Sequence, residues 1–293
     1  MPNSAILPAA ASRPPDALPD FVYVGAGKSG STWLSEVLRE HPQVFVPEVK
    51  DIFFFDQHHE RGLDWYAEFF EGRKPHHAVA GELSHDYFHT SEAMQRMRQA
   101  VPNARILVCL RDPVDHLRSR FQYRQSLGLP CPDDLMAFFT CPSSARQNDH
   151  VGNLRRVLDA YPRAQVKVMF YEDLKADPTA FARDLFTFLG VDPDVATAST
   201  QRVVLGAQRS RFPFLTRMIV RRALAARNAG LVGLVGRLKR SALLNAILFQ
   251  RLSARPALDP VLGRTLFERF APQYAEIERL SGRPVPDAWR RWA

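Results

Sequence analysis

Cysteine and long apolar runs are scarce in this sequence of 293 residues. The three cysteines, Cys109, Cys131 and Cys141, form an odd set without the paired spacing of a zinc site. No run of 18 or more apolar residues occurs, and the first twenty residues lack the cationic and apolar regions of a signal peptide. These absences predict a protein of the reducing cytoplasm, with a disordered tail over residues 1–20 and a single folded domain over 21–293.

Acidic residues are outnumbered, with 31 Asp and Glu against 39 Lys and Arg, a formal net charge of +8. Such an excess indicates an anionic partner: nucleic acid, a lipid surface or a phosphorylated small molecule. Many arginines lie among apolar residues over 209–255, where the period is helical. The pattern predicts a basic helical C-terminal subdomain, as an insertion or lid, and makes this segment a candidate for peripheral membrane contact.

Short apolar runs alternate with helical stretches along the chain. Strands are expected at Phe21–Val24, Val44–Val46, Ala78–Gly81, Arg105–Leu110 and Gln165–Phe170. Helices are expected at about 31–41, 63–70, 91–100, 113–126, 151–160, 178–189 and 261–281, followed by an exposed Trp-rich tail. This alternation predicts an α/β fold with a central parallel sheet flanked by helices, which binds its ligand at the carboxyl ends of the strands.

A loop of small residues, Gly25–Thr32, joins the first strand to the first helix. Small residues let backbone N–H groups approach an anion, and Lys28 adds a mobile charge beside the hydroxyls of Ser31 and Thr32. A Walker loop would have glycine six residues before the lysine, where this chain has Val22. The sequence therefore predicts a P-loop-like phosphate site without the usual magnesium–nucleotide arrangement.

A second anion site is predicted where the fourth strand ends. Arg111 and Asp112 follow that strand, and Pro113 suits the first turn of the next helix. Ser119 lies two turns along this helix. An arginine at a strand end and a hydroxyl on the following helix suit the binding of one more phosphate.

The two segments G-x-x-K-S-G-S-T-W-L and L-R-D-P-x-x-x-x-x-S resemble the donor signatures of PAPS-dependent sulfotransferases. In that family the first segment holds the 5′-phosphosulfate, and the arginine and serine of the second hold the 3′-phosphate. The resemblance implies PAPS as donor, PAP as product and no metal. It assigns donor binding to Lys28, Ser29, Gly30, Ser31, Thr32, Trp33, Arg111 and Ser119.

Further segments along most of the chain are similar to the carbohydrate branch of this family, the heparan sulfate sulfotransferases. These segments are His41–Val44, Phe53–Asp56, Gly62–Tyr66, Gly81–Phe88 and Tyr171–Leu174. The chain as a whole resembles a bacterial-type member. The resemblance implies in-line transfer of the sulfuryl group to a hydroxyl, or less favourably an amine, of a small-molecule, carbohydrate or lipid-linked acceptor.

The residue that takes the acceptor proton is left open between two candidates. Lys28 suits charge stabilisation on the bridging oxygen. Asp51 stands where the resembled branch has a catalytic glutamate and is the preferred base; His85 replaces a proline of that branch and is the rival. Leu83 stands where some carbohydrate enzymes have a substrate-binding lysine, which argues against a standard heparan-type sugar.

Other polar residues receive weaker assignments. Arg209 is a candidate to close over the donor phosphates. The histidines at 58, 59, 76, 77 and 89 are expected at the surface, because adjacent pairs chelate poorly. Two alternative functions remain: a nucleotide-dependent P-loop kinase, and a basic protein that binds a membrane surface or nucleic acid. The sequence does not indicate an oligomeric state.

Overall fold

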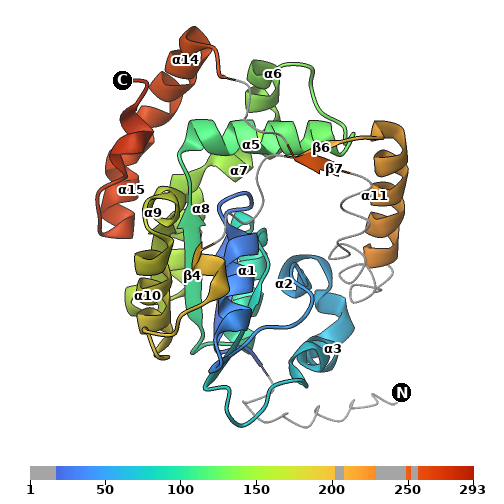
Figure 1. Ribbon diagram of the computed structural model, residues 1–293, viewed down its shortest axis with the longest axis vertical. Helices are drawn as coiled ribbons and strands as arrows, with labels where there is room; N and C mark the ends of the chain where they lie inside the picture. The colour runs from blue at the N-terminus through green and yellow to red at the C-terminus, as the bar shows by residue number, and fades with distance from the viewer. Residues whose placement is uncertain (1–17, 202–207, 229–248, 252–256) are drawn as a thin grey trace, which may run out of the picture.

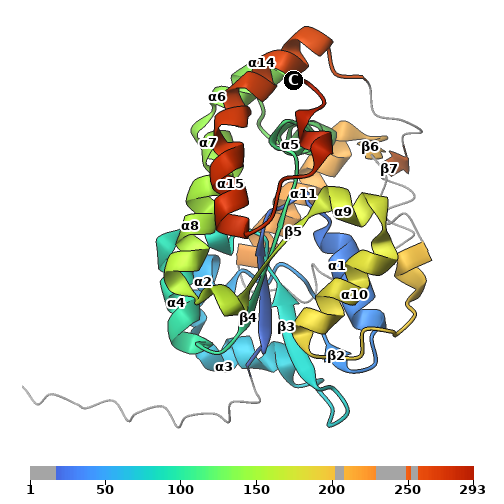
Figure 2. The same ribbon diagram turned by 90° about the vertical axis from the view of Figure 1, so that its left-hand side faces the viewer.

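The computed structural model describes residues 18–201, 208–228, 249–251 and 257–293. Its centre is a five-stranded, fully parallel sheet in the order β2-β3-β1-β4-β5 (Figures 1 and 2). The strands are β1 Phe21–Gly25, β2 Val44–Phe45, β3 Val79–Leu83, β4 Arg105–Leu110 and β5 Val166–Phe170. All five predicted strands are confirmed, with ends that differ by two residues at most.

Helices cover both faces of the sheet, as the predicted α/β class requires (Figure 2). One face carries α1, α9 and α10, and the other carries helices that include α4, α8 and α15. The helices are α1 Ser31–Glu40, α2 Phe54–Gln57, α3 Gly62–Ala67, α4 Ser91–Ala100, α5 Pro113–Ser126, α6 Leu135–Thr140, α7 Pro142–Asn148, α8 His150–Ala160, α9 Tyr171–Ala176, α10 Pro178–Leu189, α11 Pro213–Asn228, α14 Pro260–Phe270 and α15 Tyr274–Ser281.

The unbroken apolar run of β1 follows from its position in the middle of the sheet. Phe21 and Tyr23 pack on the α1 face, whereas Val22 and Val24 pack on the opposite face. All four side chains are fully buried. A strand covered on both faces needs apolar residues at every position, which is why its sequence shows no alternation.

The C-terminal part differs from the expectation in two ways. The single helix expected over 261–281 is divided into α14 and α15 by a 3-10 turn that contains Pro272, which cannot continue the preceding helical ladder. The expected exposed tail is also wrong, because Trp289 is fully buried and its indole N–H donates to Glu172 at 2.8 Å. Arg291 then binds Asp112 at 3.0 Å and Asp115 at 2.9 Å.

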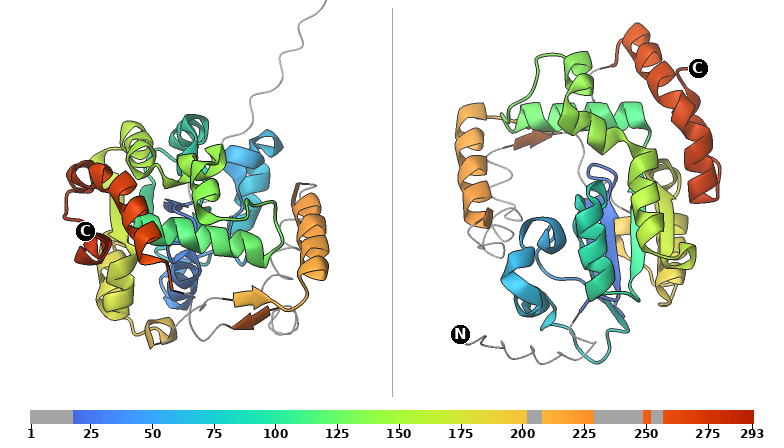
Figure 3. Two further views of the ribbon diagram at one scale, coloured as in Figure 1. Left: turned by 90° about the horizontal axis from the view of Figure 1, so that it is seen from above. Right: turned by 180° about the vertical axis from the view of Figure 1, so that it is seen from behind.

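The basic segment 209–255 is only partly described. Helix α11 confirms the helical expectation for its own residues and lies at the periphery, away from the central sheet (Figures 1 and 3). Two short strands, β6 Gln208–Ser210 and β7 Phe249–Arg251, were not expected and pair antiparallel. Their pairing joins residues about forty positions apart, so no local pattern marks it. Residues 229–248 and 252–255 lie outside the described residues.

Part of the predicted N-terminal tail is placed against the domain. Asp20 accepts a hydrogen bond from the Ala80 N–H at 2.8 Å and pairs with Arg73 at 3.0 Å. Residues 1–17 lie outside the described residues. Within the described ranges, no helix is both long and apolar enough to cross a membrane.

Candidate active site

The predicted phosphate loop connects β1 to α1 at the carboxyl end of the sheet. Lys28 has φ +66° and Gly30 has φ +92°, so the chain turns sharply before the helix. Gly30 is the N-cap, and no side chain caps the first turn of α1. The first N–H groups of α1 therefore remain available to an anion, which the positive end of the helix dipole also favours.

Neighbouring elements hold the loop in place. The Ala26 N–H donates to the Cys109 carbonyl at 3.0 Å, and the Arg111 guanidinium donates to the Lys28 carbonyl at 3.2 Å. One ring nitrogen of His116 lies 2.7 Å from the Gly27 carbonyl. Sequence analysis missed His116, since a histidine inside α5 carries no motif. The geometry of the loop therefore depends on β4 and α5, and the two predicted anion sites are in direct contact.

Helix α5 lies beside the phosphate loop and contributes side chains next to Lys28. The Lys28 ammonium lies 4.2 Å from the centre of the Tyr123 ring, a cation–π contact. Ser119 is buried one helical turn before Tyr123 and therefore lies on the same side of α5. Lys28 therefore contacts the side of α5 that also carries Ser119, and their joint role in a donor site stays a prediction.

Two buried polar atoms fit an anionic ligand. The Ser29 hydroxyl and the Arg111 Nε are buried and have no hydrogen-bond partner among the described residues. Arg111 is 4% exposed, and its guanidinium stacks 4.6 Å from the centre of the Tyr171 ring. A buried donor without a partner is unfavourable, and phosphate oxygens would satisfy both atoms.

The two rival bases are hydrogen-bonded to each other. The His85 Nδ1 lies 2.7 Å from the Asp51 carboxylate. Asp51 has φ +62°, and its N–H donates to the Leu83 carbonyl at 2.7 Å, which fixes it beside the end of β3. A Cβ on Gly27 would meet the His85 ring at 2.7 Å. The pair therefore lies directly against the phosphate loop, and only glycine fits at position 27 without moving the ring.

The charge state of His85 follows from its neighbours. Burial lowers the pKa of His85, but the carboxylates of Asp86 and Asp51 outweigh that effect, and the pKa is raised above its ordinary value. The side chain of His85 is 30% exposed and that of Asp51 11% exposed. The imidazole is therefore the more accessible of the two groups.

A buried carboxyl group supports this pair. Glu82 on β3 accepts hydrogen bonds from Ser84 at 2.6 Å, Tyr87 at 2.7 Å and Tyr66 at 2.9 Å. The Ser84 and Tyr87 hydroxyls in turn accept the backbone N–H groups of residues 53 and 54. This network fixes the segment after Asp51. Sequence analysis quoted Glu82 only as part of a motif and gave it no role.

Lys50 is a second residue that sequence analysis missed. Its ammonium donates to the Thr32 hydroxyl at 3.0 Å and to the Ser31 hydroxyl at 3.4 Å. The available signal was a lysine directly before the candidate base Asp51. That signal was too short to separate a site residue from an ordinary surface lysine.

Other predicted site residues have different surroundings. The Trp33 indole donates to the Ser199 carbonyl at 2.9 Å, and its ring packs edge-on against Phe181. Leu83 is buried in the core on the α1 face. Arg209 lies on β6, opposite Gln250 of β7, and β6 contacts α5. The Arg209 side chain is outside the described part of the structure.

The surface assignment of the histidines is wrong at two positions, His58 and His89. His58 is 3% exposed and packs edge-on against Trp65, because it follows the buried α2. The side chain of His89 is 9% exposed, and burial lowers its pKa to about 4. Among the described residues no three His, Cys, Asp or Glu side chains are grouped as metal ligands. The aromatic residues at 54, 55 and 66 belong to the core.

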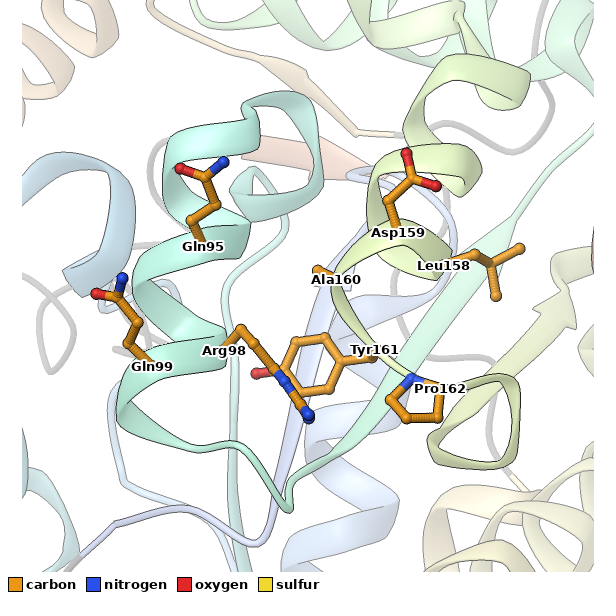
Figure 4. A pocket seen from close by; sticks show the side chains of 8 residues that line it. All are labelled: Gln95, Arg98, Gln99, Leu158, Asp159, Ala160, Tyr161 and Pro162. Carbon is orange, nitrogen blue, oxygen red and sulfur yellow. The ribbon is translucent and has the colours of Figure 1, made fainter.

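A separate hollow of about 570 Å³ lies between α4 and α8 (Figure 4). Arg98 and Tyr161 line it, with the guanidinium 5.3 Å from the ring centre. Both helices end there just before β4 and β5 begin, so the hollow is at the amino edge of the sheet. It is therefore opposite the phosphate loop.

The parallel sheet and the loop between β1 and α1 define a P-loop-like α/β fold. Residues 18–213 match the family model described as "Sulfotransferase domain". The chain therefore belongs to the sulfotransferase family of enzymes, which sets aside the kinase alternative.

Individual relatives agree with this assignment. The chain is 30% identical over 201 residues to the human "Bifunctional heparan sulfate N-deacetylase/N-sulfotransferase 3", over 61% of this chain and 23% of the relative. It is 32% identical over 108 residues to the "Membrane-associated sulfotransferase kil1" of Dictyostelium discoideum, over 36% of this chain and 23% of the relative. The chain thus spans about a quarter of the length of these relatives, and its sequence is similar to the heparan sulfate branch.

A solved structure supports the fold over nearly the whole chain. The crystal structure of a sulfotransferase from Alicyclobacillus acidocaldarius aligns with a TM-score of 0.66 and 24% identity. The alignment covers 94% of this chain and 99% of that one. The predicted P-loop-like fold is therefore confirmed.

Proposed function

We propose that this protein transfers the sulfuryl group of PAPS to an acceptor held beside His85. The observation that carries the proposal is the contact between the His85–Asp51 pair and the Gly27 backbone of the phosphate loop. This contact puts a proton acceptor next to an anion cradle. Transfer to an alcohol or amine requires both.

The donor would be held at two points. The α1 N-terminus, Lys28 and the hydroxyls at 29, 31 and 32 suit the 5′-phosphosulfate, and Arg111 with Ser119 suits the 3′-phosphate. The contact of Arg111 with the Lys28 carbonyl favours one ligand that spans both points. Trp33 and Arg209 remain proposals for the same donor.

His85 is the better base on accessibility, which revises the preference for Asp51. With Nδ1 protonated, His85 donates to Asp51 and leaves Nε2 to accept the acceptor proton. The acceptor oxygen or nitrogen then forms a bond to sulfur while the bond from sulfur to the 5′-phosphate oxygen breaks. The released electron pair stays on that oxygen as PAP leaves, and Lys28 stabilises the charge that develops there.

A carbohydrate is the acceptor class that the relatives favour. The name of the human relative specifies heparan sulfate and N-sulfation. The chain covers 23% of that protein, so the acceptor does not follow from the match alone. We favour a hydroxyl acceptor over an amine, as expected from the sequence, and Leu83 argues against a heparan-type sugar.

A peripheral membrane contact is proposed as an accessory property. Helix α11 exposes Leu215, Met218 and Ile219 together with arginines at 217, 221 and 222, and Arg211 and Phe212 are exposed just before it. Apolar side chains beside arginines suit an anionic lipid surface. The second relative is named as membrane-associated. In this proposal residues 21–293 form one sulfotransferase domain, in which 209–255 is an insertion or lid.

Calorimetry with PAP tests the proposed function. We expect wild-type protein to bind PAP equally with magnesium and with EDTA, and Lys28→Ala to weaken binding at least tenfold, because a charge-assisted contact is lost. Lys74→Ala, an exposed lysine before β3, is the matched control and should bind as wild type does. An absence of PAP binding by the wild type, or binding that requires magnesium, would refute the proposal.

A further inference from the structure

Lys50 and Asp51 are neighbours in the chain but serve different partners. The Lys50 ammonium reaches the Ser31 and Thr32 hydroxyls at the start of α1, and the Asp51 carboxylate reaches His85. Asp51 has a left-handed backbone conformation at the point where the two side chains turn to different partners. One short segment thus contacts both the donor loop and the proton acceptor.

The hydrogen bonds of Lys50 constrain the two hydroxyl groups. An ammonium only donates, so the Ser31 and Thr32 oxygens accept from Lys50 and must direct their own O–H bonds elsewhere. Neither hydroxyl donates to another group among the described residues. Both protons are therefore available to an anion at the N-terminus of α1.

Strand order places the two lysines of the site on opposite sides of the loop. Lys50 follows β2, which lies on the β3 side of β1, and α5 follows β4 on the other side. The Lys28 ammonium is directed to Tyr123 of α5. A group between them would be contacted by positive charge from both sides.

We infer that Lys50 is a donor-contacting residue, whose ammonium binds the transferable sulfonate of PAPS together with the Ser31 and Thr32 hydroxyls that it orients. This inference rests on the proposed function and adds to it the group that recognises the sulfonate. A residue that binds the sulfonate favours PAPS over PAP, because PAP lacks the sulfonate.

Comparison of PAPS with PAP isolates the contact. For Lys50→Met we expect the Kd for PAPS, measured by calorimetry without acceptor, to rise about tenfold or more, because a charge-assisted hydrogen bond is lost. The Kd for PAP should change by less than about threefold, and Lys50→Arg should retain part of the PAPS affinity. Lys74→Met, an exposed lysine, is the control.

The outcomes separate this inference from the proposed function. If Lys50→Met weakens PAPS and PAP binding equally, or changes neither, Lys50 does not bind the sulfonate. Its hydrogen bonds to Ser31 and Thr32 would then only stabilise the loop. Failure of the wild type to bind PAP would instead remove the proposed function. Thermal unfolding of each variant checks the fold, and Lys50→Gln replaces Lys50→Met if the latter is unstable.

Discussion

The His85 imidazole depends on a small number of neighbours for its position. Asp51 holds Nδ1, Phe53 packs edge-on at 5.3 Å, and Gly27 leaves space for the ring. Asp51 and Phe53 belong to the segment before α2, whereas Gly27 belongs to the phosphate loop. The side chain is therefore held by two segments, its Nε2 lies 3.7 Å from the Asp86 carboxylate, and it remains 30% exposed to an acceptor.

A pH profile tests this arrangement at the level of single residues. His85 must be neutral to accept a proton, so transfer should fall as the pH decreases through its raised pKa. Asp51→Asn removes one of the charges that raise this pKa and should shift the acidic limb to lower pH. His85→Gln should reduce kcat about 10²- to 10⁴-fold.

The measurement is the rate of transfer from radiolabelled PAPS between pH 5 and 9. PAP affinity of both variants is the control, because neither residue is assigned to PAP binding. An unchanged kcat in His85→Gln with loss of activity in Asp51→Asn would return the base to Asp51.

Local sequence predicts the role of some site residues and not of others. Lys28, Arg111 and Ser119 could be assigned because they stand at fixed spacings after strands. The partnership of His85 with Asp51 could not, because it depends on a turn between β2 and α2 that brings distant residues together. Lys50 and Glu82 were missed for the same reason, since their roles exist only through tertiary contacts.

At the level of elements, the strands and most helices were predictable because their patterns are local. Helices α4, α5 and α10 begin and end where expected, since each starts with a capping Thr or Asp and two have proline in the first turn. The burial of Trp289 was not predictable, because it depends on the partner Glu172 on α9. Local polarity alone suggested an exposed tail.

The buried carboxyl group of Glu82 predicts that the free energy of unfolding depends on pH. Burial raises the pKa of Glu82 to about 7, although hydrogen bonds from Ser84, Tyr87 and Tyr66 lower it. The native protein therefore keeps a proton that the unfolded chain releases near pH 4.5. The free energy of unfolding should decrease by up to about 3 kcal/mol as the pH rises from 4.5 through 7.

Glu82→Gln should remove this pH-dependent part of the free energy of unfolding, because the amide does not titrate. Urea unfolding at pH 5, 6, 7 and 8 measures the effect, and the variant should gain stability relative to wild type as the pH rises. Glu92→Gln, on the exposed side of α4, is the matched control. Parallel pH curves for wild type and Glu82→Gln would contradict the prediction.

At the scale of the whole molecule, part of the net positive charge lies on α11, where Arg217, Arg221 and Arg222 are exposed. We expect the protein to bind vesicles that contain phosphatidylserine and not vesicles of phosphatidylcholine alone. The double variant Arg217→Ser/Arg221→Ser should bind the anionic vesicles about thirtyfold more weakly, at about 1 kcal/mol per basic residue.

Co-sedimentation measures this binding. Arg155→Ser/Arg183→Ser changes the net charge equally at exposed positions elsewhere and is the control. A similar loss in both double variants would indicate attraction by net charge, without a specific role for α11.

The attachment of Arg291 to Asp112 and Asp115 has a consequence for how the second anion site is assembled. The two carboxylates lie beside Arg111, which is itself 3.7 Å from Asp115, and they meet Arg291 only when the segment that carries Arg291 has packed. Without that partner, two acidic groups would repel a phosphate approaching Arg111. The segment that carries Arg291 therefore completes the second anion site, and a nucleotide bound there would in turn stabilise the packing of that segment.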